Sequence, residues 1–333
     1  MKKVRRGKLF AIVMLLLTIA GSLLNFEMVQ ATETDNTTAS SEESQSGKVT
    51  KSSNVTKKVT KKNADVSMEA VCGIDGFAAY DNPVPIFVTV TYTKDFTGSI
   101  RITPVMEDVG QTVVAYGEDI SLAKGEAKTF SFTPSILGGN GKIKIELLDE
   151  KEKVIYAETD TVSLTGIGTN VVMGILSDDY SGLTYFDGVP AVFDSYQGVV
   201  NALELTNASF PESKDALSIL NYILIDNYDT ANLSDEQYTA LKGWVNDGGV
   251  LILSLGANYQ NVLHKFSDEF VSGTLGNMNK NQITWNIEGQ ELSLDDVDSM
   301  EFVLDGGEEL KNFSVDKTAY KKEVGLGAVV VLS

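Results

Sequence analysis

The spacing of apolar residues changes near residue 167, and this change limits the folds open to the chain. Before it, short segments such as 85–92 alternate apolar and polar residues, which is typical of strands with one buried face. After it, short runs are almost continuously apolar, at 171–176, 222–225 and 250–253. Such runs indicate strands buried on both faces of a sheet. We therefore expect two domains, an antiparallel β-sandwich followed by an α/β domain with a parallel sheet.

The sandwich is expected over residues 64–166. Gly, Pro and Asn separate its alternating segments at short intervals, and no helical periodicity intervenes, which favours an immunoglobulin- or fibronectin-like domain. Its expected strands include 85–92, 99–103, 128–132, 142–147 and 154–157. This architecture carries no information about function by itself.

A helix is expected over residues 234–246 of the second domain, which we place at 167–333. Ser234 and Gln237 form a capping-box pair, and Leu241 and Trp244 belong to an apolar face with helical spacing. Gly248-Gly249 then ends the helix. Because apolar runs flank this helix closely, we expect a β-α-β unit with parallel strands. Further strand elements are expected as a hairpin at 282–294 and strands at 300–304 and 328–332.

The stretches 221–228, 233–237 and 244–253 resemble the class I glutamine amidotransferase-like superfamily. They are most similar to its non-catalytic members in large bacterial envelope proteins, and the resemblance covers roughly residues 170–333. It implies a flavodoxin-like parallel α/β domain after an immunoglobulin-like sandwich, and often a C-terminal membrane segment. Because the buried strand expected at 328–332 ends at the terminus, we also expect a longer native protein that continues past Ser333.

The resemblance also locates a degenerate catalytic position. Catalytic members carry a cysteine nucleophile on a tight turn after this helix and strand, activated by a histidine. Here Ser254 stands in that place, and Ile252 replaces the glycine of a serine-hydrolase elbow. The single histidine of the chain is His264, ten residues further on. We expect a non-catalytic domain, with a serine hydrolase using Ser254 as the alternative.

Polar residues follow the three buried strands of the second domain. Ligands of open parallel sheets bind beyond the carboxyl ends of the strands, where these side chains should converge. Their oxygen atoms could hold calcium or hydrogen-bond sugar hydroxyls, and ordinary turn residues are the other interpretation. We assign no metal ligands and, apart from Ser254 in the alternative, no catalytic residues. The candidate ligand-binding residues are Asp178, Asp179, Asp226, Asn227 and Ser254.

The N-terminus predicts export. A basic head precedes sixteen uncharged residues from Leu9 to Leu24, and Val29-Gln30-Ala31 suits signal peptidase, so residues 1–31 are expected to be a signal peptide. An uncleaved anchor is the alternative. Residues 32–63 are rich in Ser, Thr and Lys and are expected to be a disordered tether. The single cysteine, Cys72, excludes an intrachain disulfide.

Charge narrows the partners. The formal net charge is −19, and it becomes −23 without residues 1–31, which contain five basic residues and one acidic residue. Such a chain repels nucleic acid and anionic lipid. We expect a Gram-positive-type envelope protein, on the extracellular face of the membrane or in the wall, that binds another envelope protein or wall polymer. The alternative is an auxiliary component of a membrane transport or secretion complex, attached to the membrane through the N-terminal or a missing C-terminal segment.

Overall fold

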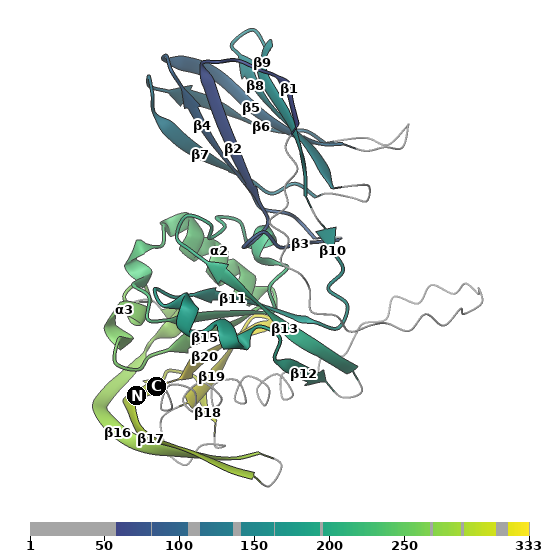
Figure 1. Cartoon of the computed structure of the whole chain (residues 1–333). Coiled ribbons are helices and arrows are strands. Elements are labelled where there is room, and N and C mark those ends of the chain that lie inside the picture. Colours follow the sequence, from purple (N-terminus) through teal and green to yellow (C-terminus); the bar gives the residue numbers. More distant parts are fainter. Residues whose placement is uncertain are drawn as a thin grey trace, which may run out of the picture.

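The computed structural model describes residues 58–80, 82–105, 114–135, 141–162, 164–193, 196–266, 269–287, 290–310 and 319–332. The predicted signal peptide and residues 32–57 of the predicted tether lie outside this part. The chain forms an antiparallel β part, drawn above a larger mixed-sheet part in Figure 1. Within the described ranges, no helix is both long and apolar enough to cross a membrane.

The antiparallel part contains two sheets. The first has the order β1-β9-β8-β5-β6 and the second β2-β4-β7, while β3 and β10 form a short parallel pair. Alternating residues of both sheets, such as Val88 on β4 and Ile145 on β8, meet in one buried core. The bounds are β1 Lys58–Lys61, β2 Val66–Cys72, β3 Ala78–Ala79, β4 Ile86–Tyr92, β5 Phe96–Pro104, β6 Tyr116–Leu122, β7 Ala127–Phe132, β8 Lys142–Asp149, β9 Val154–Thr161 and β10 Leu164–Thr165.

The first sheet begins earlier than the sequence suggests. Strand β1 lies within the predicted tether, yet it pairs antiparallel with the edge of β9. Backbone hydrogen bonds hold an edge strand in place and do not depend on side-chain type. The lysine-rich composition of β1 therefore does not indicate a strand. All five alternating segments expected as strands do form strands, β4, β5, β7, β8 and β9.

The second part contains an eight-stranded mixed sheet of order β12-β13-β11-β14-β15-β20-β19-β18. The five strands from β13 to β20 run parallel, while β12, β19 and β18 are antiparallel to their neighbours. The bounds are β11 Val171–Leu176, β12 Pro190–Phe193, β13 Tyr196–Leu205, β14 Tyr222–Asp226, β15 Val250–Ser254, β18 Glu308–Glu309, β19 Ala319–Val324 and β20 Gly327–Leu332.

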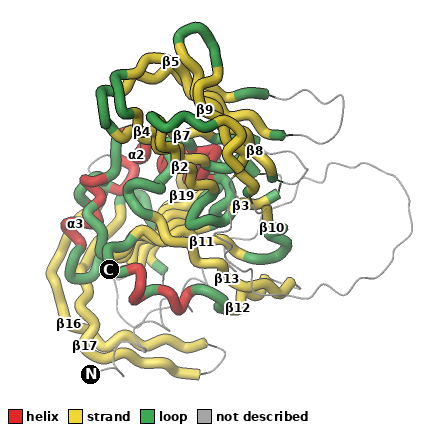
Figure 2. Tube along the Cα trace, turned by 45° about the horizontal axis from the view of Figure 1, so that its top comes forward, coloured by secondary structure: helices red, strands yellow, loops and turns green. Residues whose placement is uncertain are grey.

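The predicted fold class, with a flavodoxin-like parallel α/β domain, is wrong. The described part of the chain is mostly strand, has several antiparallel sheets and contains two α-helices, α2 (Asp235–Asn246) and α3 (Tyr259–Leu263). Figure 2 shows the helices, in red, confined to short segments among the yellow strands. Apolar runs indicate buried strands, but they do not show that a helix connects each of them. Most connections here are loops, short 3₁₀ turns or further strands.

One local unit matches the expectation. Strands β14 and β15 are parallel neighbours, and α2 connects them. The Ser234 hydroxyl accepts a hydrogen bond from the Gln237 backbone amide at 3.1 Å, and the Gln237 side chain accepts one from the Ser234 amide at 2.9 Å. The capping box is thus complete and satisfies two free amides of the first turn.

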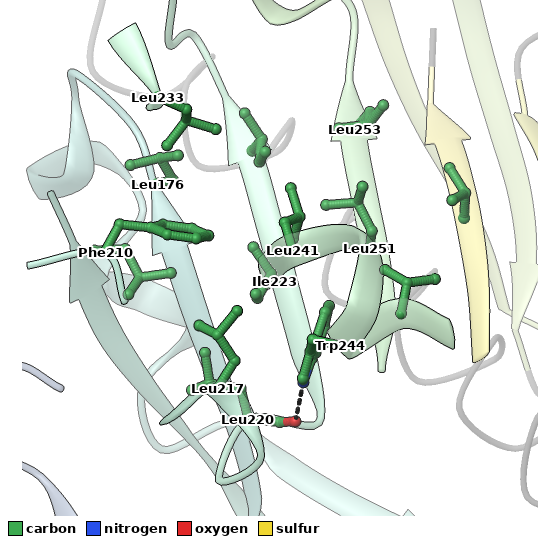
Figure 3. Packing of buried hydrophobic residues seen from close by; sticks show 14 of the residues in the cluster. Leu176, Phe210, Leu217, Leu220, Ile223, Leu233, Leu241, Trp244, Leu251 and Leu253 are labelled. Carbon is green, nitrogen blue, oxygen red and sulfur yellow. Dashed lines mark hydrogen bonds between the residues drawn. The ribbon is translucent and has the colours of Figure 1, made fainter. Parts of the chain in front are cut away.

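The central strands β11, β14 and β15 of the mixed sheet are buried on both faces. Helix α2 packs Leu241 and Trp244 against one face, where they meet Ile223 and Leu251 of the strands (Figure 3). The other face is covered by the 3₁₀ turns η1 (Tyr180–Gly182) and η2 (Thr184–Phe186), with Phe186 fully buried. Remaining short helical turns are η3 Lys214–Leu217, η4 Thr230–Asn232 and η5 Glu269–Val271.

A long two-stranded ribbon leaves this part of the molecule (Figure 1). It consists of β16 (Gly273–Ile287) and β17 (Gln290–Leu304), each of 15 residues. The hairpin expected at 282–294 and the strand expected at 300–304 are the two ends of this single ribbon. Phe302 and Leu304 bury its base in the core of the mixed sheet.

The two parts of the chain share a contact. Ile74 and Phe77, between β2 and β3, belong to the same buried cluster as the face of the mixed sheet that carries α2. The Asp75 carboxylate accepts a hydrogen bond from the Glu204 amide on β13 at 3.1 Å. Apolar packing and this hydrogen bond therefore join the antiparallel part to the sheet.

Candidate functional site

The carboxyl ends of β11, β14 and β15 lie side by side. These strands are consecutive in the sheet and parallel, and Asp226 and Ser254 are register partners at the last position of β14 and β15. The polar residues after them therefore meet at one edge. We call Asp178, Asp179, Asp226, Asn227 and Ser254 the strand-end cluster.

Asp226 and Ser254 are directly linked. Burial raises the pKa of Asp226, a side-chain hydrogen bond with Ser254 lowers it, and the charge of Asp179 raises it again. The net shift is upward, because removing a carboxylate from water costs more than one hydroxyl returns. Asp179 is thus close enough to be felt electrostatically, although its own side chain is exposed.

Asp178 and Asn227 form the second half of the cluster. The Asp178 amide donates to the Asn227 carbonyl at 3.3 Å, which connects the loop after β11 to the loop after β14. Asn227 has a φ of 48°, a left-handed conformation that asparagine tolerates better than most residues. Its side-chain oxygen accepts a hydrogen bond from Asn258, in the turn after β15. All three strand ends are therefore tied together.

Two tyrosines at this edge were not expected from the sequence. The hydroxyl oxygens of Tyr185 and Tyr228 are buried and have no hydrogen-bond partner among the described residues. Burial and the charge of Asp226 raise the pKa of Tyr185. Burial also raises the pKa of Tyr228, and the negative charges of Asp178 and Asp229 raise it further. Tyr185 lies in a 3₁₀ turn without periodicity, so only the fold brings it near Asp226.

His264 does not join the cluster through a hydrogen bond. It is the C-cap of α3, and its Nδ1 lies 3.1 Å from the Asp229 carboxylate. The imidazole is 60% exposed. The side chain that lies beside Ser254 is instead Asp226, its register partner on β14, whose pKa Ser254 lowers. Among the described residues, the imidazole of His264 is therefore not placed as a hydrogen-bond partner of the Ser254 hydroxyl.

Neither the thiol nor a metal cluster adds a reactive centre in the described ranges. Cys72 is buried in the antiparallel part, and burial together with Asp160 and Glu158 raises its pKa to about 12. Such a thiol is almost wholly protonated at neutral pH and is a weak nucleophile. The described residues also contain no group of three or more His, Cys, Asp or Glu side chains placed to hold a metal ion.

The arrangement suits hydrogen bonding to an uncharged polar ligand. It offers carboxyl, amide and hydroxyl groups at one edge, and two buried phenol groups there have no hydrogen-bond partner among the residues that the structure describes. A buried hydroxyl without a partner costs free energy, which a ligand hydroxyl or water could recover.

One family model matches residues of the antiparallel part. A model described as a domain of unknown function, DUF8726, matches residues 65–164. This range spans the strands from β2 to the start of β10, and the description assigns them no activity. A search of curated proteins gave no significant match.

Structural comparison gives distant likenesses. An exo-β-1,4-mannosidase, Op5Man5 from Opitutaceae bacterium strain TAV5, is 14% identical over 40% of this chain and 23% of its own, with a TM-score of 0.29. The C-terminal domain of wzt is 10% identical over 34% of this chain and 77% of its own, with a TM-score of 0.24. A Paenibacillus cycloisomaltooligosaccharide glucanotransferase is 10% identical over 69% of this chain and 34% of its own, also with a TM-score of 0.24.

These likenesses carry no argument for or against an enzymatic activity of this chain. The chain spans only 23% of the mannosidase that it matches. None of the matches tests the amidotransferase-like resemblance, which stays a prediction. The fold class that it implied is the part that the structure corrects.

Proposed function

We propose that this chain is a non-catalytic, extracytoplasmic cell-envelope protein that binds a polyhydroxylated ligand, such as a wall glycan, at the strand-end cluster. Its basic and apolar N-terminal segment supports export. Its acidic composition supports an uncharged or cationic partner in preference to an anionic one.

The observation that carries the proposal is the pairing of Ser254 with Asp226 beside buried, unpartnered hydroxyls. Asp226 and Ser254 are register partners on neighbouring strands, the Ser254 side chain lowers the pKa of Asp226, and burial of the carboxyl raises it by more. Tyr185 adds a buried hydroxyl, and the charge of the Asp226 carboxyl raises the pKa of this hydroxyl. Sugar hydroxyls donate and accept hydrogen bonds, so they complement such a set without requiring a nucleophile or a metal.

The test is a thermal-shift titration of the full chain with tetra-N-acetylchitotetraose and with a soluble disaccharide–peptide wall fragment. Calcium chloride forms a separate arm. Binding to the folded state adds about 2.7 kcal/mol to the free energy of unfolding at a ligand concentration 100 times the Kd. The melting temperature rises accordingly. We expect a saturable shift with a glycan, and no added shift with calcium.

Asp226→Ala should abolish the glycan-induced shift, whereas Asp226→Asn should retain part of it because the amide keeps hydrogen-bonding atoms in place. Asp119→Ala, an exposed aspartate on β6, is the matched control. The comparison uses the ligand-induced shift of each variant, since removing a buried carboxylate changes the unliganded melting temperature. Equal glycan shifts in all variants would contradict binding at the cluster.

Catalysis is tested separately with a fluorophosphonate that labels activated serines. We expect no labelling of the full chain. Labelling that Ser254→Ala abolishes would show a nucleophilic serine and would refute the non-catalytic part of the proposal. Export is tested by mass spectrometry of the mature chain after expression in a Gram-positive host, where cleavage after Ala31 predicts an N-terminus at Thr32.

A further inference from the structure

A cleft lies at the ends of β14 and β15 opposite to the strand-end cluster. It has a volume of about 690 Å³ and is lined by the first residues of β14 and β15, Tyr222 and Val250, by the end of α2, and by the β19–β20 turn. The strand-end cluster contains the last residues of β14 and β15, so the two sites lie at different edges of the sheet. This volume falls within the usual range for small-molecule sites.

The rim of the cleft is preformed. The β19–β20 turn has Gly325 at a φ of 61° followed by Leu326, and the Leu326 amide donates to the Asn246 carbonyl at 2.8 Å. A Cβ on Gly325 would collide with Asn246, and one on Gly327 with the Val245 carbonyl oxygen. Only glycines let the turn sit this close to the end of α2. The turn holds Leu326, 67% exposed, at the edge of the cleft.

The floor is apolar. Leu220, Tyr222 and Trp244 are each at most 7% exposed. The indole N–H of Trp244 donates to the Leu220 carbonyl at 3.2 Å (Figure 3), so the protein already uses this donor. Burial raises the pKa of Tyr222 to about 12, which keeps its phenol neutral. The floor therefore suits an apolar part of a ligand.

The charged groups of the cleft leave a negative excess. Three carboxylates and two ammonium groups line it. Lys214 pairs with Asp247, and Lys321 lies 3.4 Å from Glu323. The Asp215 carboxylate has no hydrogen-bond partner within the described part, although its charge contributes to the raised pKa of Lys214 after the larger effect of Asp247. The C-terminal end of the 12-residue helix α2 adds partial negative charge.

We propose that this cleft binds a primary ammonium group carried on an apolar stem, with the ammonium beside Asp215 and the stem against Leu326 and Tyr222. A lysine side chain of a peptide and a free alkylamine share this chemistry. The exposed Asp215 carboxylate would repel an anion, and an uncharged apolar ligand would make no ion pair with it. This site is independent of the function proposed for the strand-end cluster.

The test is saturation-transfer NMR of the full chain with Nα-acetyl-lysine methylamide and with its norleucine analogue, which keeps the stem but lacks the charge. We expect the lysine compound to bind at least about threefold more tightly, and Asp215→Asn to weaken it about two- to fivefold. Asp119→Asn, the matched exposed control, should leave it unchanged. Leu326→Ala should weaken both compounds.

Cadaverine separates the two sources. Binding equal to that of the lysine compound indicates a free amine, and binding only of the lysine compound indicates a peptide side chain. The proposal is overturned if the lysine compound shows no saturation transfer, if the norleucine analogue binds equally well, or if Asp215→Asn has no effect. None of these outcomes depends on whether a glycan binds at the strand-end cluster.

Discussion

Trp244→Phe tests how the end of α2 is fastened to the mixed sheet. The indole is 3% exposed, and its N–H donates to the carbonyl of Leu220, just before β14. Gly249 lies against the ring so closely that a Cβ there would overlap the indole. Trp244 therefore connects the helix, the start of β14 and the turn into β15 by one hydrogen bond and by packing.

The expected loss of unfolding free energy is about 2–4 kcal/mol. Phenylalanine has no donor, so the buried Leu220 carbonyl loses its partner at a cost of about 1–3 kcal/mol. The smaller ring also leaves a gap in a close-packed region, which costs roughly 1 kcal/mol more. Tyr222→Phe is the matched control from the same cleft. Its hydroxyl makes no hydrogen bond with the described residues, so its change should stay within about 0.5 kcal/mol.

The measurement is urea unfolding followed by far-UV circular dichroism. A lower midpoint with an unchanged m-value reports a change of stability rather than of the unfolded ensemble. If Trp244→Phe lost less than about 1 kcal/mol, or no more than Tyr222→Phe, the hydrogen bond to Leu220 would not be the fastening that the structure indicates.

Three further changes test other parts of the structure. Gly325→Ala should lower the free energy of unfolding by more than about 2 kcal/mol, because it adds a clash with Asn246 to the strain of a positive φ. Gly125→Ala, at a φ of 75° with open space around it, is the control and should lower it by about 1 kcal/mol. Thermal melts compare the two variants. Ser234→Ala should cost about 1 kcal/mol in urea unfolding by removing the capping box, and an unchanged midpoint would argue against that role. Burial raises the pKa of Asp226, so its stabilising contribution is complete below the unfolded pKa of about 3.9 and is lost as pH rises through the folded-state value. Asp226→Asn should therefore be more stable than the parent at neutral pH and less dependent on pH across that window; parallel melting curves from about pH 3 to about pH 8 would contradict this.

The candidate site could be outlined from the sequence because one rule of sheet geometry sufficed. Parallel strands end at the same edge, so the polar residues after three buried runs had to gather if those strands were neighbours. Asp226 and Ser254 are register partners at the ends of neighbouring strands, and Ser254 influences the pKa of Asp226. Tyr185 and Tyr228 could not be found in this way, since their positions depend on how a 3₁₀ turn and a loop pack over the strand ends.

The sequence by itself determined the local elements of this protein. Helix α2 follows from a capping box, an apolar face and a glycine stop, all within sixteen consecutive residues (234–249), and the alternating and continuous apolar runs mark strands because side-chain direction has a short, fixed period. Only the tertiary structure decided the order of the eight strands, the antiparallel edges of the mixed sheet, the pairing of β1 and the cleft beside Trp244. These features rest on contacts between segments far apart in the chain, and local periodicity does not specify which segments meet.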